Sequence, residues 1–173
     1  LIVSDGPANT IISVTVTAND GGNAMIFEMG SDVYAAQALA QYYNGSNKFI
    51  NAMGATDAGH QDRDEATVAD ACPNIHNVAI TVCDRALAYT LSTYVNGEPA
   101  AVAGQETGGS HGTNTTWSTL VSNLGCRNDG ASLSLNGYIR EFIVLKRALT
   151  IGEACRVSKA LMIKSGVTSM YAS

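Results

Sequence analysis

Apolar and polar residues alternate over residues 11–17, where Ile12, Val14 and Val16 are separated by serine and threonine. Side chains on a β-strand point to opposite faces in turn, so this period of two predicts a strand with one buried and one solvated face. We expect the apolar side chains inside the protein. The solvated side would carry Ser13, Thr15 and Thr17.

Further apolar segments predict a series of short strands. They cover residues 24–29, 78–82, 88–95, 117–124, 131–135 and 138–145. The last of these ends in four consecutive apolar residues, which is typical of a central strand covered on both faces. Such a series, separated by turn residues, favours an all-β sandwich or barrel.

Three Asn-Gly pairs, at 44–45, 96–97 and 136–137, mark expected reversals of the chain. Asn-Gly is the favoured pair in two-residue hairpin turns, because both positions need a positive φ. Residues 52–75 differ, since they are rich in alanine, aspartate, histidine and glycine and have no sustained period. We expect them to leave the sheet as a long loop, with one short helical turn over 64–71.

One helix is predicted near the C-terminus. Thr150 and Glu153 have the spacing of a capping box, in which the threonine hydroxyl accepts from the N3 amide and the glutamate from the cap amide. The apolar residues Ala154, Val157 and Leu161 then follow one face of the helix. We expect this face to be buried against the sheet.

Composition changes the picture in two ways. Only 14% of the 173 residues are charged and 17 are glycines, which favours short strands and tight turns over a helical bundle. The net charge is −5 and no basic cluster stands out, so we exclude nucleic acid as a partner, because its phosphates need lysine and arginine.

Membrane insertion is not expected, because no apolar run reaches the ~20 residues of a membrane helix. We expect a single domain over residues 1–173, either whole or part of a longer chain.

The four cysteines form no C-x-x-C pair, which argues against a zinc or thioredoxin-like site. They are Cys72, Cys83, Cys126 and Cys155. A chain of this length can build a full core without covalent links, so we expect reduced, buried thiols that pack as small apolar residues. A disulfide between two of them is the alternative.

Four segments between residues 77 and 153 resemble a known family. Residues 77–82 (NVAITV), 94–98 (YVNGE), 135–142 (LNGYIREF) and 147–153 (RALTIGE) are similar, in this order, to motifs of concanavalin A-like, or laminin-G-like, jelly rolls. The resemblance implies a two-sheet antiparallel jelly-roll sandwich with one short C-terminal helix.

Within these motifs, we expect Glu141 and Arg147 to have an architectural role, with Glu141 bonding a neighbouring loop or an arginine and Arg147 acting in the same way. The family contains lectins, carbohydrate-binding modules, glycosidases, adhesion domains and bacteriophage structural or receptor-binding proteins. A fold alone does not choose among these functions.

The low charge, the absence of a disulfide scaffold and the C-terminal segment 161–167 are most similar to the phage and bacterial members. The resemblance therefore implies a non-enzymatic structural or adhesive domain of a virion, in capsid decoration, a fibre or the tail. Its partners would be other virion proteins, copies of itself or a cell-surface glycan, on a virion or extracellular surface. The alternative is a secreted carbohydrate-binding module of a bacterial surface protein or glycosidase.

Catalytic chemistry finds no support in the sequence. Glucan-hydrolysing members of the family carry a Glu-x-Asp-x-x-Glu strand, because two carboxylates must flank the scissile bond, and this spacing is absent. The nearest acidic group is Asp62, Asp64 and Glu65, close to His60, and we expect it on a solvated loop. A G-x-S-x-G elbow is missing as well. We expect no catalytic residue, and a glycosidase with an unusual acid pair is the weakest alternative.

Sugar binding would need an aromatic ring that stacks on an apolar sugar face, with polar groups around it. Tyr42 and Tyr43 are adjacent on an expected strand, so they should point to opposite faces and at least one should be exposed. Trp117 is the only tryptophan and has packing in the core as its alternative role. The candidate ligand-binding residues are Tyr42, Tyr43, His111, Trp117, Arg127 and Asp129.

We expect no cofactor, with calcium as the open alternative, because relatives in the concanavalin A-like family often bind calcium near a sugar site. The candidate calcium ligands are Asp20, Asp32, Asn128 and Asp129. Calcium takes roughly six to eight oxygen ligands. Turn chemistry explains Asp20, Asn128 and Asp129 without a metal.

Overall fold

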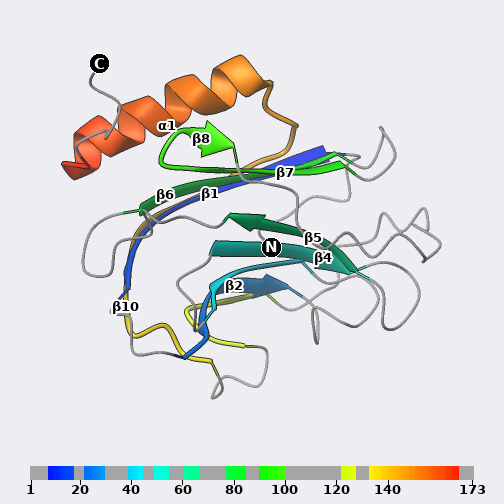
Figure 1. The fold of residues 1–173 in the computed structure, drawn as a ribbon, viewed down its shortest axis with the longest axis vertical. Coiled ribbons are helices and arrows are strands. Elements are labelled where there is room, and N and C mark those ends of the chain that lie inside the picture. Colours follow the sequence, from blue (N-terminus) through cyan, green and yellow to red (C-terminus); the bar gives the residue numbers. More distant parts are fainter. Residues whose placement is uncertain are drawn as a thin grey trace.

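The computed structural model of the chain describes residues 8–17, 22–29, 39–44, 49–54, 61–66, 77–84, 90–99, 122–127 and 133–167. Two five-stranded sheets lie face to face, and helix α1 (Ile151–Ser165) lies on the outside of the first sheet (Figure 1). The protein is therefore an all-β, two-sheet antiparallel jelly-roll sandwich with one short C-terminal helix, as the sequence predicts. Within the described residues, no helix is both long and apolar enough to cross a membrane.

Each sheet has five antiparallel strands. The first consists, in spatial order, of β10 (Gly137–Leu145), β1 (Ala8–Thr17), β6 (Asn77–Asp84), β7 (Thr90–Val95) and β8 (Glu98–Pro99). The second consists of β5 (Gln61–Ala66), β4 (Phe49–Gly54), β3 (Leu39–Tyr43), β2 (Ala24–Met29) and β9 (Ser122–Leu124). Strands β1, β2, β6, β7 and β10 lie where apolar segments of the sequence predict them.

Helix α1 begins and ends as the sequence predicts. Thr150 Oγ1 accepts a hydrogen bond from the Glu153 amide at 3.3 Å, and the Glu153 carboxylate accepts from the Thr150 amide at 2.8 Å, which confirms the capping box. Gly166 ends the helix in the left-handed conformation, at φ 72°. Upstream of the helix, Thr10 of β1 donates to the Arg147 carbonyl oxygen at 2.8 Å. The segment that enters the helix is therefore tied to the first sheet.

The apolar side of β1 packs under the helix. Ile12 and Val82 are 2% and 7% exposed, so the expected burial of the apolar positions is confirmed. They belong to a cluster between the first sheet and α1, which we call the outer layer. Its buried members are Ile12, Val14, Val78, Ile80, Val82, Tyr94, Leu149, Ala154, Leu161 and Met162.

The serine and threonine side of β1 faces the second sheet. Ser13 and Thr15 are fully buried and Thr17 is nearly so, which means that the expected solvation of these side chains is wrong. Strand β1 has a neighbour on each side and a covering layer on each face, so neither face meets water. We call the cluster between the two sheets the inter-sheet layer. Its buried apolar members are Ile11, Ala24, Ile26, Phe27, Met29, Leu39, Tyr43, Ala79, Cys83, Leu91 and Val95.

Polar side chains in the inter-sheet layer bond to each other across the two sheets. The hydroxyl oxygens of Thr15 and Tyr43 lie 3.1 Å apart, and Gln41 Nε2 donates to Thr81 Oγ1. These contacts join β1 and β6 of the first sheet to β3 of the second. Hydrogen bonds and apolar contacts therefore hold the sheets together jointly.

Residues 52–75 do not form the long loop that the sequence indicates. Part of this segment forms the end of β4 and all of β5, so the loop and the start of its expected helical turn are wrong. Strand β5 (QDRDEA) has no hydrophobic period, which is why the pattern misses it. It is an edge strand, and charged residues suit an edge because they discourage pairing with another chain.

Strand β10 corrects another prediction. Both its faces are covered as expected, because Phe142 and Val144 pack against the inter-sheet layer while Ile143 and Leu145 pack against the outer layer. However, β10 is an edge strand of the first sheet and not a central one. Apolar side chains on both faces of a strand therefore indicate that both faces are covered. They do not indicate whether the strand is central or at an edge of its sheet.

The Asn-Gly pairs have different roles. Asn96 and Gly97 have φ of 51° and 89° between the paired Val95 and Glu98, which confirms the two-residue turn. At the first pair, the expected hairpin of β3 and β4 is present. Its register joins the strands through residues 44–48, so the connection is longer than a two-residue turn.

Gly137 serves close packing rather than a turn. Its φ is not positive, so the turn expected at 136–137 is wrong. A Cβ atom at this position would collide with the backbone of Val16. Glycine is required here because β10 and β1 approach closely where their pairing begins.

Two ion pairs fasten α1 to its surroundings. Glu141 of β10 binds Lys164 at 2.8 Å, so its partner is a lysine on the helix and not the expected loop or arginine. Arg147 binds Glu153 at 2.9 Å. Both contacts support the architectural role expected of Glu141 and Arg147.

The described cysteines are all free thiols. Cys83 is buried, Cys126 is half-buried and Cys155 is exposed on α1, so the expectation of buried thiols is correct only for Cys83. Cys72 lies outside the described residues.

Candidate functional site

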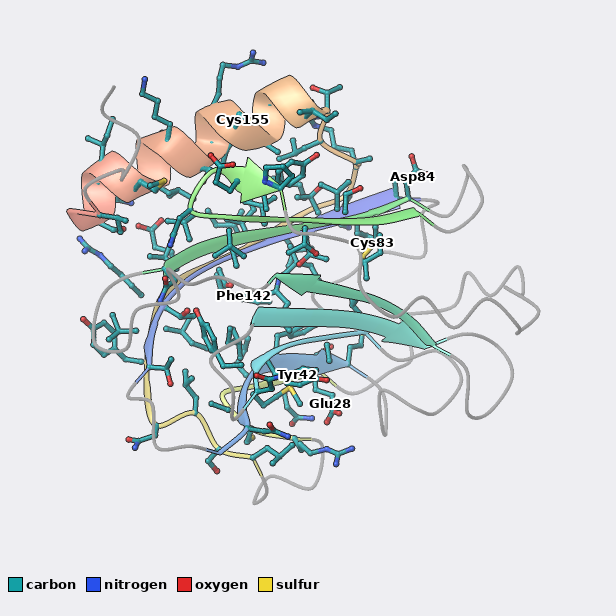
Figure 2. All side chains as sticks on the ribbon, in the orientation of Figure 1. Glu28, Tyr42, Cys83, Asp84, Phe142 and Cys155 are labelled. Atoms are coloured by element: carbon teal, nitrogen blue, oxygen red, sulfur yellow. The ribbon has the colours of Figure 1, made fainter. Side chains whose placement is uncertain are left out.

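The outer face of the second sheet carries a compact group of side chains. Met25, Ala40 and Tyr42 form a buried cluster, and Leu133 packs against it. In Figure 2, Tyr42 lies on the second sheet, whereas Phe142 occupies the space between the sheets. The group is therefore separate from the inter-sheet layer.

A β-bulge in β2 brings an acidic residue to this face. Met25 pairs with Tyr42 and Glu28 pairs with Ala40, with an irregularity between Met25 and Phe27. In a regular strand, positions 25 and 28 would point to opposite faces, and one extra residue brings them to the same face. Glu28 lies on β2 beside Tyr42 (Figure 2) and is fully buried.

The carboxylate of Glu28 is paired with an arginine. Arg127 Nε lies 3.5 Å from Glu28 Oε1, and 28% of the Arg127 side chain is exposed while none of the Glu28 side chain is. A buried carboxylate is costly unless a positive group accompanies it. Glu28 therefore holds the guanidinium of Arg127 at the border between the protein interior and solvent.

Backbone hydrogen bonds hold the turn that carries Arg127. The Gly125 amide donates to the Ile26 carbonyl oxygen at 2.9 Å, and the Leu135 amide donates to the Gly125 carbonyl oxygen at 2.7 Å. Gly125 has a φ of 76°, which favours glycine. The Met25 amide also donates to the Leu133 carbonyl oxygen at 2.8 Å. Residues 133–135 thus line the edge of β2 without forming the strand expected over 131–135.

Tyr42 and Tyr43 point to opposite faces of the second sheet, as their adjacency predicts. Tyr42 belongs to the outer-face cluster and Tyr43 to the inter-sheet layer. They are only 9% and 4% exposed, so the expectation that one of them is open to solvent is wrong. Leu133 packs against the outer-face cluster that contains Tyr42 and so contributes to the burial of this ring.

Tyr43 is a structural residue. Burial raises the pKa of its phenol from 10.0 to about 12, although hydrogen bonds with Thr15 and Asn77 act in the opposite direction. The phenol therefore stays neutral at any ordinary pH. Its place between the sheets suits cross-linking of the sandwich rather than stacking on a sugar.

The remaining candidates lie outside the described residues. Of the expected ligand-binding residues, these are His111, Trp117 and Asp129; of the expected calcium ligands, they are Asp20, Asp32, Asn128 and Asp129. His60 lies outside as well, and residues 62–65 form part of strand β5 and not a loop. In the part of the chain that the structure describes, no three acidic, histidine or cysteine residues gather as metal ligands. The roles expected of the candidates outside the described residues stay predictions.

Sequence reasoning identified Tyr42 and Arg127 but missed Glu28 and Met25. One signal was present, since Glu28 is the only charged residue in the apolar segment 24–29. A lone acid in a buried strand requires a partner. The bulge that turns Glu28 toward Tyr42 has no marker in the sequence, because β2 contains no glycine or proline.

The comparisons with known proteins concern the fold. No model of a protein family matches the chain, and no curated protein is significantly similar to it in sequence. Solved structures do match. One is the CBM40 of the Ruminococcus gnavus IT-sialidase bound to α2,3-sialyllactose, with a TM-score of 0.69 and 16% identity over 89% of this chain and 84% of that one.

Two further structures extend the likeness. The K499G mutant of NanB sialidase from Streptococcus pneumoniae matches 88% of this chain with 24% of its own, at 15% identity and a TM-score of 0.66. The native heptameric SAP-like pentraxin from Limulus polyphemus matches 88% of this chain with 70% of its own, at 15% identity and a TM-score of 0.60. The chain thus shares the two-sheet jelly-roll fold of these structures.

Proposed function

We propose that the protein is a carbohydrate-binding module that binds a glycan at the outer face of its second sheet. The observation that carries this proposal is the Glu28–Arg127 pair beside Tyr42, in which a buried carboxylate positions an arginine whose side chain is partly exposed. A guanidinium has five N–H donors in a planar fork, so an arginine positioned by one carboxylate can bind a second anionic group. The first ligands to test are therefore glycans that carry a carboxylate.

The similarity in fold to solved structures also supports the proposal of a carbohydrate-binding module. The R. gnavus module that this chain resembles in fold is bound to α2,3-sialyllactose, and a related structure is bound to α2,6-sialyllactose. These structures favour the secreted carbohydrate-binding module over the virion domain that the sequence resemblance first implied. No observation on the described residues favours a place in a capsid, fibre or tail. We accordingly propose an extracellular surface as the location of the module and a cell-surface glycan as its partner.

Binding without catalysis fits the composition of the site. The proposed site pairs one carboxylate with one guanidinium, whereas glycoside hydrolysis needs two carboxyl groups that flank the scissile bond. We therefore propose a role in attachment for the module. Any hydrolysis would belong to another domain.

The test is a glycan array probed with the purified chain, followed by calorimetric titration with α2,3-sialyllactose. We expect binding to sialylated glycans and at least a roughly tenfold loss of affinity in Arg127→Ala, because one charge-assisted hydrogen bond is worth about 1.5–3 kcal/mol. Arg127→Lys should also lose affinity, since lysine keeps the charge but lacks the fork.

Lys159→Ala, which removes an exposed cation on α1, is the matched control and should bind α2,3-sialyllactose as the wild-type chain does. Circular dichroism of each variant checks that the sandwich is intact. Failure of the wild-type chain to bind any glycan on the array would refute the proposed function. Unchanged affinity in a folded Arg127→Ala variant would refute the proposed site.

A further inference from the structure

The charges of this protein are distributed unevenly. Residues 140–164 contain six of the ten lysines and arginines but only two acidic residues, Glu141 and Glu153, which gives this segment a net charge of +4. Because the whole chain carries −5, the remaining residues carry −9. Only Lys146 and Arg147 are adjacent in the sequence, and the other four cations are spaced along the segment. The expectation of no basic cluster is nevertheless wrong, because the fold gathers these residues in one layer.

We call this group the basic layer. It comprises Arg140, Lys146, Arg147, Arg156, Lys159 and Lys164, all of which are exposed. They lie on α1, on the edge strand β10 of the first sheet and in the segment that joins β10 to α1 (Figure 1). The candidate glycan site lies on the outer face of the other sheet. The two surfaces are therefore on opposite sides of the sandwich.

The acidic residues of the segment are already engaged. Glu153 binds Arg147 at 2.9 Å and Glu141 binds Lys164 at 2.8 Å. Among the residues that the structure describes, no carboxylate pairs with Lys146, Arg156 or Lys159. Arg140 donates only to a carbonyl oxygen, that of Lys164, at 3.4 Å. The basic layer thus presents positive charge that its own surroundings do not neutralise.

The helix arranges part of this charge in a line. With 3.6 residues per turn, Gly152, Arg156, Lys159 and Ile163 follow one stripe of α1. This stripe lies opposite the buried stripe of Ala154, Ser158, Leu161 and Ser165. Arg156 and Lys159 therefore lie on the crest of the helix, farthest from the sheet. The rise of 1.5 Å per residue places Arg156 about 12 Å from Lys164 along the axis.

We propose that the basic layer binds a linear, sulfated polysaccharide at a second site, independent of the glycan site. Arg156 and Lys159 lie along the exposed crest of α1, and this arrangement suits an extended polyanion. A small anion would instead need cations that converge on it from several sides. Nucleic acid is disfavoured, since α1 has no aromatic side chain on which bases could stack. A membrane surface is disfavoured as well, because Ile163 is the only large apolar residue on the crest.

The test is binding of the full chain to immobilised heparin over a series of salt concentrations. We expect affinity to fall as salt rises, as it does when cations on a protein displace the counterions of a polyanion. Arg156→Glu/Lys159→Glu should bind about tenfold more weakly or worse, because both crest charges are reversed. Lys48→Glu/Arg85→Glu makes the same change in net charge outside residues 140–164 and should retain wild-type affinity within about twofold.

Three results would overturn the proposal. The first is unchanged heparin affinity in a crest variant whose circular dichroism is native. The second is an equal loss in both double variants, which would indicate dependence on net charge alone. The third is tighter binding of the wild-type chain to a single-stranded oligonucleotide or to phosphatidylglycerol vesicles than to heparin at equal ionic strength. Sialyllactose binding is measured separately, so failure here leaves the proposed function intact.

Discussion

The outer layer and the inter-sheet layer lie on opposite faces of the first sheet. The same strands contribute to both, but the side chains that they contribute differ in polarity. The outer layer, beneath α1, is lined by aliphatic side chains such as Ile12, Val14 and Ile80. The inter-sheet layer combines apolar residues with buried serine, threonine, asparagine and glutamine. A helix requires only apolar contact from the sheet below it. Two sheets can also bond to each other through side chains, as Thr15 and Tyr43 do.

This difference explains why the alternation of residues separated the apolar face of β1 from its polar face correctly, but predicted wrongly that the polar face is solvated. The pattern separates apolar from polar positions, and that separation is real. It carries no information on which face meets the helix and which meets the second sheet. Small polar residues can lie in a core when they form hydrogen bonds there. The polar face of a strand is therefore not always exposed to solvent.

The largest effect is expected from the outer layer. Ile80 is fully buried between the first sheet and α1. Ile80→Ala should lower the free energy of unfolding by about 2–5 kcal/mol, since it removes apolar contact and leaves a cavity. Denaturant unfolding measures this loss. Ile163→Ala, at a position 71% exposed, is the control and should change stability by less than about 0.5 kcal/mol. Equal losses would contradict the assignment of Ile80 to a packed layer.

A smaller effect is expected from the hydrogen bond between the sheets. Tyr43→Phe removes a hydroxyl and deprives Thr15 Oγ1 of its partner 3.1 Å away. We expect a loss of about 1–2 kcal/mol in the free energy of unfolding, because a buried polar group is left behind. Tyr138→Phe alters an exposed tyrosine and should have little effect. A stability equal to wild type in Tyr43→Phe would show that this contact contributes nothing.

Alkaline titration examines the same residue. Burial raises the pKa of Tyr43 from 10.0 to about 12, so the folded protein holds the phenolic proton more tightly than the unfolded chain does. The corresponding stability is fully present below pH 10 and is lost as pH rises from 10 toward 12. Unfolding curves recorded across this range should show a decline that Tyr43→Phe diminishes. A decline of the same size in both proteins would assign it to other groups.

The smallest effect is expected at Ser13. Its hydroxyl is buried in the inter-sheet layer and has no hydrogen-bond partner among the described residues. Ser13→Ala removes this hydroxyl and should leave the free energy of unfolding within about 0.5 kcal/mol of wild type, or raise it slightly. Thermal unfolding of the variant measures the change. A loss above 1 kcal/mol would mean that the hydroxyl is bonded after all, most simply to a buried water.

The sequence predicts those parts of the fold that depend on local rules. The capping box at Thr150 and Glu153 and the turn at Asn96–Gly97 follow from the conformations that these residues favour, and both are confirmed. Strand β5 could not be found in this way, because a charged edge strand has no hydrophobic period. Its place depends on pairing with β4, which is a property of the assembled sheet.

The candidate site was predictable only in part. Arg127 and Tyr42 stood out as a cation and an aromatic residue, but their proximity depends on a bulge in β2 and a left-handed glycine at 125. These features turn Glu28 toward the outer face and bring the segment of Arg127 beside it. Such placement arises from tertiary structure, so a single sequence cannot reveal it.

The most direct test of the account is an NMR titration of the ¹⁵N-labelled chain with α2,3-sialyllactose. We predict amide shift changes at Glu28, Tyr42 and Arg127 on the outer face of the second sheet, with the amides of α1 unaffected. Shift changes confined to α1 or to the inter-sheet layer would contradict the proposed site. An unchanged spectrum at high concentrations of the sugar would contradict the choice of sialylated glycans as ligands.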